Sequence, residues 1–436
     1  MKPLRLPCAI LIVYLISLAY WVILSTKSFS ADIIGYKDLG YIFYHQGLTG
    51  YLTTGLHREP LYPLFCALAM RIEDISKFSF TQIMAGFSVL ILMATQVLTY
   101  SILRKLQIRT WICSLTLLYL AISPVITNSA FHILPFCEII TYPLILAAII
   151  AGYTGWEAIK QNDQNKAFCY GAFTGILFAT ITFVKAAFEC ISPVYMLFFL
   201  MASLKRNSSR RSLVCFLAAA AVLFYSPVVG YKCLNKIYNG NFAIADRGPN
   251  TIYGNVAHRT SPLSFRGYLA DLTSVAGDDV CAKYFSAKEC SFWSFHKSDE
   301  LGANKSGEFF NRGLPAQAVT DKLLRLSKDL AWTHLPQYIL LTATESLRGL
   351  FWEGTTDLIS FHLIMAVITC IVLLYCGFTW GYLPDLMRQV QIIIFSFIFF
   401  YSFFDILPRH ILPIVPLYLI SLGYCLDSLM PLPSKY

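Results

Sequence analysis

The chain has 436 residues, of which 56% are hydrophobic and 14% are charged, and its mean hydropathy is +0.58. A soluble domain carries about 25% charged residues, so the composition excludes an ordinary soluble globular protein. The apolar runs are continuous rather than short and alternating, which excludes a transmembrane β-barrel. The net charge of +9 indicates basic loops on one side of a membrane, not a nucleic-acid partner. The sequence therefore predicts an all-α polytopic membrane protein.

Apolar runs that suit membrane-spanning helices recur along the chain, each needing about 20 residues. The first run follows Lys2 and Arg5 and has no small-residue cleavage site after it, so it indicates a retained span rather than a signal peptide. Two shorter apolar stretches, 60–72 and 338–352, indicate interfacial or partly inserted helices. If 338–352 crosses the membrane, the last three spans are inverted. We expect a bundle of about 10 to 12 transmembrane helices, with spans near 8–25, 82–103, 111–127, 136–156, 167–184, 190–204, 212–230, 358–378, 391–407 and 410–428.

Alternate short loops are basic, and the positive-inside rule places such loops in the cytoplasm. Two long segments then lie outside: 26–81 and the polar stretch between the seventh and eighth spans. The chain accordingly divides into an N-terminal transmembrane module, 1–230, an outer loop or small cap, 231–337, and C-terminal transmembrane helices, 338–436. The basic residues that define the inner side are Lys2, Arg5, Arg104, Lys105, Arg109, Lys160, Lys166, Lys205, Arg206, Arg210, Arg211, Arg388 and Lys435.

Thirteen cysteines are scattered mostly through apolar runs, where they act as small hydrophobic residues. Their spacings do not match a zinc site. Cys281 and Cys290 differ, because they fall in the polar outer loop. An oxidising outer compartment favours a disulfide between them, and two free thiols are the alternative.

Ionisable residues lie beside several predicted spans, where charges are costly and usually functional. Glu138 opens the fourth span, and Lys185 and Glu189 bracket the outer turn between the fifth and sixth spans. The alternative for each is an anchor that reaches to water, and for Lys185 it is a surface pair with Glu189 at i,i+4. The outer turn between the last two spans adds three more ionisable residues, Asp405, Arg409 and His410.

The first outer segment carries an acid and an aromatic residue four positions apart. Asp32 and Tyr36 would share one face of a helix, and a glycine-rich turn ends that pattern. Arg58, Glu59 and Pro60 then precede another apolar helix, with Pro60 suited to its first turn. For Asp32 the residue pattern leaves two interpretations, a catalytic carboxylate or a cap of the loop helix.

These patterns resemble the GT-C superfamily of membrane glycosyltransferases, and within it the branch with protein O-mannosyltransferases and the lipid A aminoarabinose transferase. The first outer segment is similar in its order: an acid after the first span, a tyrosine four residues on, a glycine-rich turn and the stretch Arg-Glu-Pro-Leu-Tyr-Pro. The stretch ISPVITNSAFHILPFCEIITYPLIL, 122–146, resembles the second outer turn of the superfamily, where a second acid lies, here Glu138. Arg409-His410-x-x-Pro413 resembles a segment near the end of these chains.

The resemblance implies an inverting transfer of a hexose or pentose from a polyprenyl-phosphate donor to an acceptor at the outer face. It implies Asp32 as the general base that takes the acceptor proton, with Glu138 as a second catalytic carboxylate. The leaving group is an anionic lipid phosphate, which needs cationic donors. No Asp-x-Asp pair surrounds Glu138, so no divalent metal or other cofactor is expected. The candidate substrate-binding residues are Tyr36, Arg58, Lys185, Arg409 and His410.

The expected partners are the lipid bilayer, the polyprenyl-phosphate sugar, and a lipid, glycan or protein acceptor. We expect a bacterial inner membrane with the site facing the periplasm. A transporter or flippase for lipid-linked glycans is the first alternative, and it predicts repeats and charges near the membrane midplane. A glycan polymerase or ligase is the second, and it usually places its basic residues in large late outer loops.

Overall fold

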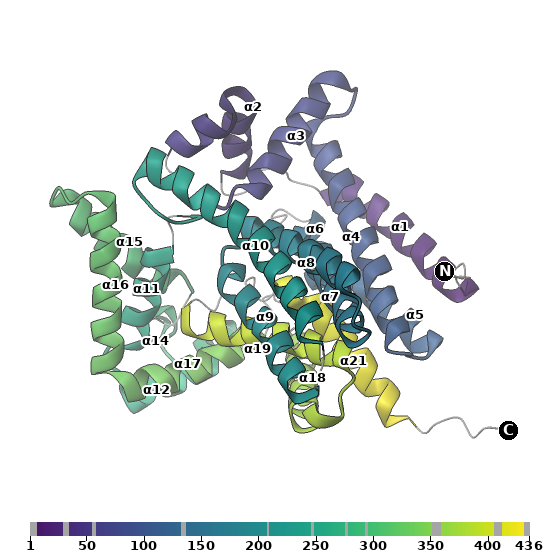
Figure 1. The fold of residues 1–436 in the computed structure, drawn as a ribbon. Coiled ribbons are helices and arrows are strands. Elements are labelled where there is room, and N and C mark those ends of the chain that lie inside the picture. The colour runs from purple at the N-terminus through teal and green to yellow at the C-terminus, as the bar shows by residue number, and fades with distance from the viewer. Residues whose placement is uncertain are drawn as a thin grey trace.

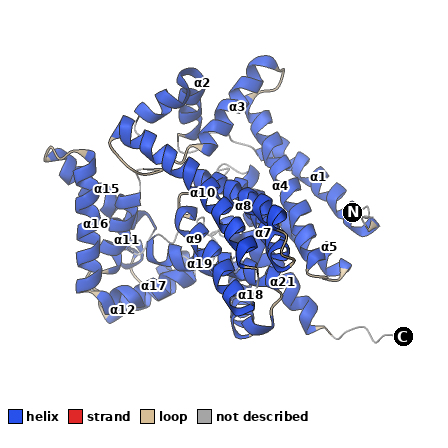
Figure 2. Ribbon diagram, in the orientation of Figure 1, coloured by secondary structure: helices blue, strands red, loops and turns tan. Residues whose placement is uncertain are grey.

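In the computed structural model every regular element of the described residues is a helix (Figure 2). Six of these helices are long and apolar enough to cross a bilayer by length and composition: Cys8–Ser25, Phe80–Lys105, Cys137–Lys160, Gln164–Val184, Arg210–Asn239 and Leu412–Leu429. The prediction of an all-α, multi-pass membrane protein is confirmed at this level. The structure describes residues 7–28, 35–54, 58–131, 137–206, 209–245, 248–274, 278–292, 295–350, 359–404 and 412–430.

Both ends of the chain contribute helices to one bundle, as the mixture of purple, blue and yellow ribbons in Figure 1 shows. Helix α1 packs against α4 and α5, α21 packs against α4 and α5, and α19 packs against α9. In chain order the bundle elements are α1 (Cys8–Ser28), α4 (Phe80–Lys105), α5 (Thr110–Ile122), α6 (Pro124–Phe131), η1 (Cys137–Ile140), α7 (Thr141–Lys160), α8 (Gln164–Val184), α9 (Phe188–Arg206), α10 (Arg210–Asn239), α18 (Ile359–Phe378), η3 (Trp380–Tyr382), α19 (Asp385–Phe404), η4 (Leu412–Ile414) and α21 (Val415–Leu429).

The predicted span 111–127 is not one continuous helix. Helix α5 ends at Ile122, and α6 begins at Pro124. A proline forces the preceding residue out of the helical conformation, and Ser123 indeed has ψ of 120°. The proline itself suits the first turn of the new helix, so it divides the apolar run in two.

Helices α7, α8 and α10 form the centre of the bundle (Figure 1). Two glycines on α8 allow it to approach α10 closely. A Cβ atom at Gly171 would lie 2.3 Å from the carbonyl oxygen of Phe216, and one at Gly175 would lie 2.3 Å from that of Ala220. The glycines are four residues apart and therefore face the same neighbour, an arrangement that membrane helices use for close packing.

The short loops that were predicted to be cytoplasmic meet at one end of the bundle. Arg109, before α5, pairs with Asp427 near the end of α21 at 3.6 Å. Lys160, at the end of α7, pairs with Asp385 at the start of α19 at 3.5 Å. The opposite end carries the first long segment, which lies at the top of Figure 1. The basic loops before α5 and after α7 therefore lie at the end of the bundle opposite the first long segment; which end faces the cytoplasm stays a prediction.

The first long segment folds as two helices, α2 (Tyr36–Thr53) and α3 (Leu61–Ile75), which pack against each other. Gly47 interrupts α2 with φ of 66°, a left-handed value that glycine adopts without steric cost. The hydroxyl of Tyr44 donates a hydrogen bond to Asp74 of α3. Helix α3, which contains a stretch predicted to be interfacial, is not among the candidate membrane spans of the described residues.

A helical cap lies beside the bundle, in teal and green at the left of Figure 1. Its described residues have small apolar cores of their own, one around Cys281 and Leu341 and another around Phe309 and Leu323. The cap is therefore a packed unit rather than an irregular loop. Its helices are α11 (Gly248–Arg259), α12 (Phe265–Ser274), α13 (Asp278–Tyr284), α14 (Ala287–Phe292), α15 (Phe295–Asn311), α16 (Ala316–Thr333) and α17 (Leu335–Leu350).

The cap begins and ends later than the predicted outer segment, 231–337. Helix α10 continues without a break to Asn239. Helix α17, which covers most of the stretch 338–352, packs against α11, α12, α16 and the bundle helix α19. It is not among the candidate spans of the described residues, and the interfacial interpretation of 338–352 stays a prediction.

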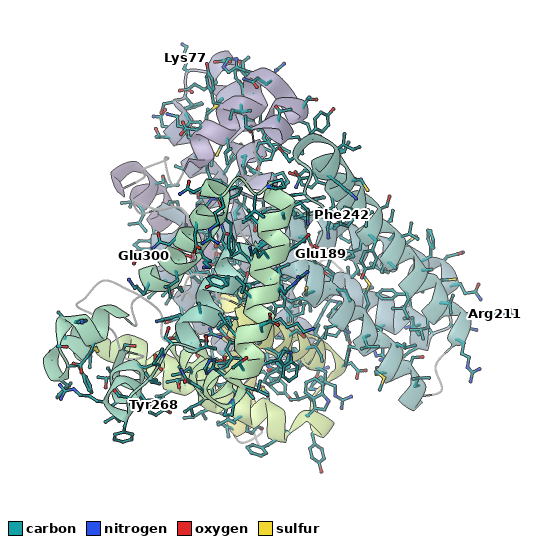
Figure 3. All side chains as sticks on the ribbon, turned by 90° about the vertical axis from the view of Figure 1, so that its left-hand side faces the viewer. Lys77, Glu189, Arg211, Phe242, Tyr268 and Glu300 are labelled. Atoms are coloured by element: carbon teal, nitrogen blue, oxygen red, sulfur yellow. A yellow bond between two sulfur atoms is a disulfide. The ribbon has the colours of Figure 1, made fainter. Side chains whose placement is uncertain are left out.

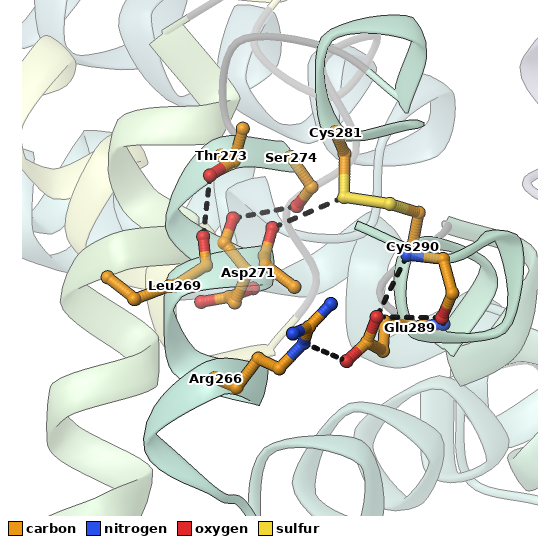
Figure 4. The surroundings of a disulfide bond; sticks show 10 residues. Arg266, Leu269, Asp271, Thr273, Ser274, Cys281, Glu289 and Cys290 are labelled. Carbon is orange, nitrogen blue, oxygen red and sulfur yellow. Dashed lines mark hydrogen bonds and ion pairs between the residues drawn. A yellow bond between two sulfur atoms is a disulfide. The ribbon is translucent and has the colours of Figure 1, made fainter. Parts of the chain in front are cut away.

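A disulfide joins Cys281 of α13 to Cys290 of α14 (Figure 4). Beside it, the carboxylate of Glu289 accepts hydrogen bonds from the hydroxyl and backbone N–H of Ser286, at 2.7 and 2.8 Å. Arg266 Nε donates a third, at 2.7 Å. Ser286 first, and Arg266 second, lower the pKa of Glu289 from 4.5 to about 2.

We expect Gly171→Ala to destabilise the bundle, because the added methyl group would overlap the backbone of α10. Overpacking of this kind costs about 1–3 kcal/mol. Gly86→Ala is the matched control, since no atom lies within 4 Å of its Cβ position, and alanine is favoured over glycine in a helix by about 0.5–1 kcal/mol. Thermal unfolding of both variants in one detergent measures the difference. An unchanged midpoint for Gly171→Ala would contradict the close packing of α8 and α10.

The lowered pKa of Glu289 makes this part of the cap acid-sensitive. The folded carboxyl binds a proton more weakly than the unfolded one, so its contribution to stability is present above pH 4.5 and is lost as the pH falls toward about 2. Hydrogen exchange of α12 and α14, corrected for the intrinsic pH dependence of exchange, should accelerate in acid more in wild type than in Glu289→Gln. The same pH response in both proteins would refute this role of Glu289.

Candidate functional site

Four segments far apart in the sequence meet at the α2–α3 end of the bundle. They are the start of α2, the loop before α3, the η1 turn before α7, and the turn between α8 and α9. One buried apolar cluster joins residues at or beside three of these segments with η4: Tyr36, Cys137, Ile139, Ile140, Val184 and Leu412. We use the name mouth cluster for the polar side chains gathered here, which are Tyr36, Arg58, Glu59, Cys137, Glu138 and Lys185.

Glu138 and Lys185 form an ion pair in the mouth cluster. Lys185 Nζ donates to Oε1 of Glu138 at 2.8 Å, and the two side chains are only 12% and 5% exposed for Lys185 and Glu138. Removing each charge from water costs several kcal/mol, and leaving one of them without the other is more costly still. The pair therefore holds the η1 turn and the end of α8 together as one unit.

The alternative pairing of Lys185 with Glu189 is wrong. Glu189 instead accepts from Lys232 of α10, with 2.7 Å between Nζ and Oε1. Lys185 ends α8 with extended backbone angles, φ −146° and ψ 102°, so positions 185 and 189 are not on one continuous helix and the i,i+4 rule does not apply. Lys232 also lies over the ring of Phe242, at 4.7 Å, and Figure 3 shows Glu189 and Phe242 near each other.

Lys185 stays charged in spite of its burial. Burial by itself lowers the pKa of the ammonium group, but the nearby Glu138 carboxylate favours the charged form, and the pKa lies above its ordinary value. Lys185 Nζ also lies 6.0 Å from the ring centre of Tyr401, in the last turn of α19. The ammonium group thus connects three separate segments of the bundle.

Tyr36 is a buried member of the mouth cluster. Its hydroxyl is 3.3 Å from Sγ of Cys137, its ring packs edge-on against Tyr62 at 4.9 Å, and the guanidinium of Arg58 lies 5.2 Å from its ring centre. Burial, and then Cys137, raise its pKa well above the usual value for a phenol. Tyr36 is therefore a neutral hydroxyl that orients its neighbours and is not a base.

Glu59 is a member of the mouth cluster that sequence reasoning missed. Its Oε1 accepts a hydrogen bond from the backbone N–H of Ala186, at 3.2 Å, which joins the loop before α3 to the α8–α9 turn. The backbone oxygen of Arg58 accepts from the hydroxyl of Tyr51, at 2.8 Å. In the sequence Glu59 stands between Arg58 and Pro60 in the Arg-Glu-Pro motif, and its position in that motif could have marked it as a candidate site residue.

Asp32, Arg409 and His410 lie outside the described residues, and their roles stay predictions. The described residues on either side of 405–411 adjoin the mouth cluster: Tyr401 faces Lys185, and η4 packs against η1. Within the described ranges, no group of three or more His, Cys, Asp or Glu side chains is arranged to hold a metal ion.

No protein-family model matches this sequence, and no curated protein matches it either. The likeness to GT-C glycosyltransferases therefore stays a hypothesis drawn from motifs. The function proposed below therefore rests on the residues of the mouth cluster.

We expect Lys185→Met to destabilise the protein by about 3–5 kcal/mol, because it leaves the Glu138 carboxylate buried without its cation. The double variant Lys185→Met/Glu138→Gln should recover much of this loss, since it removes both charges. Lys166→Met is the control, because Lys166 pairs with Asp163 at an exposed loop and such pairs contribute little. Chemical denaturation in detergent compares the four proteins. Equal loss in the single and double variants would show that the charge pair is not the cause.

Proposed function

We propose that this protein is a membrane glycosyltransferase that moves a sugar from a polyprenyl-phosphate donor to an acceptor at the outer face, with inversion. The observation that carries the proposal is the mouth cluster itself. Buried Glu138 and Lys185, together with Arg58 and Tyr36, gather at the end of the bundle that carries the two outer helices α2 and α3. Such a mixture of acids, cations and phenols beside a lipid phase suits a substrate with an anionic head and an apolar tail.

The chemistry divides into a proton to remove and a phosphate to stabilise. The acceptor oxygen loses its proton as it attacks the anomeric carbon, and Asp32 is the proposed base. The bond from that carbon to the phosphate oxygen breaks, and the phosphate leaves as an anion that needs cations rather than a proton. Arg58, Arg409 and His410 are the proposed phosphate ligands. The positive charge of Lys185 adds electrostatic stabilisation of the leaving phosphate.

Glu138 takes a different role from the one that the resemblance implies. Its carboxylate is bound to Lys185 and is nearly inaccessible to water, so it is poorly placed to exchange protons with an acceptor. We assign it to positioning, because it keeps Lys185 charged and fixed beside Tyr401. This leaves Asp32 as the proposed catalytic base.

The membrane supplies the rest of the site. The polyprenyl chain would lie among the exposed apolar side chains of the bundle, which include Leu90 and Val97 of α4. The proposal places the α2–α3 end at the periplasmic face of a bacterial inner membrane, since the basic short loops lie at the other end. The acceptor is a lipid, a glycan or a protein that reaches this face.

The proposal is tested by sugar transfer in proteoliposomes with a panel of radiolabelled polyprenyl-phosphate sugars. Wild type should transfer one of these sugars, and Asp32→Asn should lower the rate by about 10²–10⁴-fold, which is the usual contribution of a general base. Arg58→Gln should weaken donor binding about tenfold or more, as expected for the loss of a charge-assisted contact.

Lys166→Gln, at the opposite end of the bundle, is the matched control and should leave transfer unchanged. Equal transfer by wild type and Asp32→Asn would remove the base from Asp32. Flux of the lipid-linked sugar across the membrane without transfer would instead favour the transporter alternative.

A further inference from the structure

Arg259, the last residue of cap helix α11, is buried where the cap meets the bundle. Its side chain is 1% exposed. Its Nη1 donates to the hydroxyl of Thr342 on α17, at 3.0 Å, and to the backbone oxygen of Ser402 on α19, at 2.6 Å. The guanidinium therefore bridges two cap helices and the last turn of a bundle helix.

The charge of Arg259 is not balanced by a carboxylate among the described residues. The hydrogen-bond acceptors of Nη1 are neutral, the ring of Tyr338 lies 5.8 Å from the guanidinium carbon, and Nη2 has no hydrogen-bond partner in the described part of the chain. A buried cation without a counter-charge is costly. Lys185 is the opposite case, because Glu138 neutralises it.

A buried carboxylate lies one helical turn beyond Thr342 on α17. Glu345 is 7% exposed and follows Thr342 by one helical turn, so both side chains lie on one face of the helix. Its Oε1 has no hydrogen-bond partner among the described residues. The cap–bundle junction thus holds a buried donor and a buried acceptor that both lack partners.

We propose that Arg259 and Glu345 form a subsite for a glycosyl phosphate. Arg259 binds a phosphate oxygen through its unpartnered Nη2 group, and Glu345 accepts hydrogen bonds from sugar hydroxyls. One ligand of this class satisfies both orphaned groups. The subsite and the mouth cluster both contact the last turn of α19, because Ser402 accepts from Arg259 and its neighbour Tyr401 faces Lys185. The assignment rests on the proposed function for the lipid-linked form of the ligand.

Ligand-induced thermal stabilisation of the full-length protein in nanodiscs tests the subsite without any sugar transfer. The probes are inorganic phosphate, the 1-phosphates of glucose, mannose and galactose, and a polyprenyl-phosphate mannose. At least one sugar 1-phosphate or the lipid probe should stabilise wild type more than inorganic phosphate does. Stabilisation only by the lipid probe assigns the subsite to the donor headgroup, and stabilisation by a free sugar phosphate assigns it to a soluble ligand. No stabilisation by any probe overturns the proposal.

Arg259→Gln should weaken binding of every active probe by about tenfold or more. Arg259→Lys keeps the charge but removes the Nη2 group and should bind with intermediate affinity, so it serves if the glutamine variant does not fold. The control is Arg266→Gln, which removes an exposed cap arginine that pairs with Glu289 and should leave binding unchanged. Equal binding by wild type and the Arg259 variants overturns the assignment of the phosphate ligand.

The Glu345→Gln variant distinguishes binding of the sugar from binding of the phosphate. It should leave the affinity for inorganic phosphate unchanged and remove the extra affinity for the sugar phosphate. Unchanged preference for the sugar phosphate in this variant overturns the role of Glu345. These experiments measure binding and not turnover, so they test the subsite even if no sugar transfer is detected. Conversely, sugar transfer by the wild type would not show that Arg259 and Glu345 bind the ligand.

Discussion

The buried ion pair between Glu138 and Lys185 is the interaction on which the organisation of the α2–α3 end depends. Neither charge is stable there alone, since a lone buried charge costs several kcal/mol, so the η1 turn and the end of α8 must be placed together. Glu59, in the loop before α3, then accepts a hydrogen bond from the backbone of the same α8–α9 turn. Two carboxylates from separate parts of the chain thus converge on one turn, and this positions Tyr36 and Arg58 around it.

Two buried cations flank the last turn of α19, and they differ in what balances them. Lys185 lies beside Tyr401 and is paired with Glu138, whereas Arg259 bonds to the next residue, Ser402, without a carboxylate of its own in the described chain. The first arrangement is complete without a ligand and stabilises the fold. The positive charge of Arg259 has no carboxylate partner in the described chain, so it can still attract an anion. A group that binds an anionic ligand must have such an unbalanced charge before the ligand binds.

The sequence predicted the helices far better than the contacts between them. Span positions follow from local hydropathy, which is why the ends of α4 and α8 agree closely with expectation. The helix break before Pro124 could have been predicted from the proline. The continuous apolar run around it instead favoured one unbroken span, 111–127. The partner of Lys185 was not readable, because it lies 47 positions away and a closer acid, Glu189, satisfied the local rule. Arg259 gave no signal, since a single arginine in a polar helix is ordinarily solvated, and its burial depends on residues 83 and 143 positions away.

The distribution of charge along the bundle bears on the choice between chemistry and transport. Away from the helix ends, described membrane helices pair neutral polar groups: Gln96 bonds to Ser17, and Gln391 to Ser421. The ion pairs lie at helix ends, as with Lys185 at one end and Arg109 at the other. A transporter that couples to ions needs charges or broken helices near the midplane, whereas a transferase needs them where the lipid headgroup meets water. The ion pairs at the helix ends of this bundle are therefore the arrangement that the proposed transferase needs to hold a lipid headgroup.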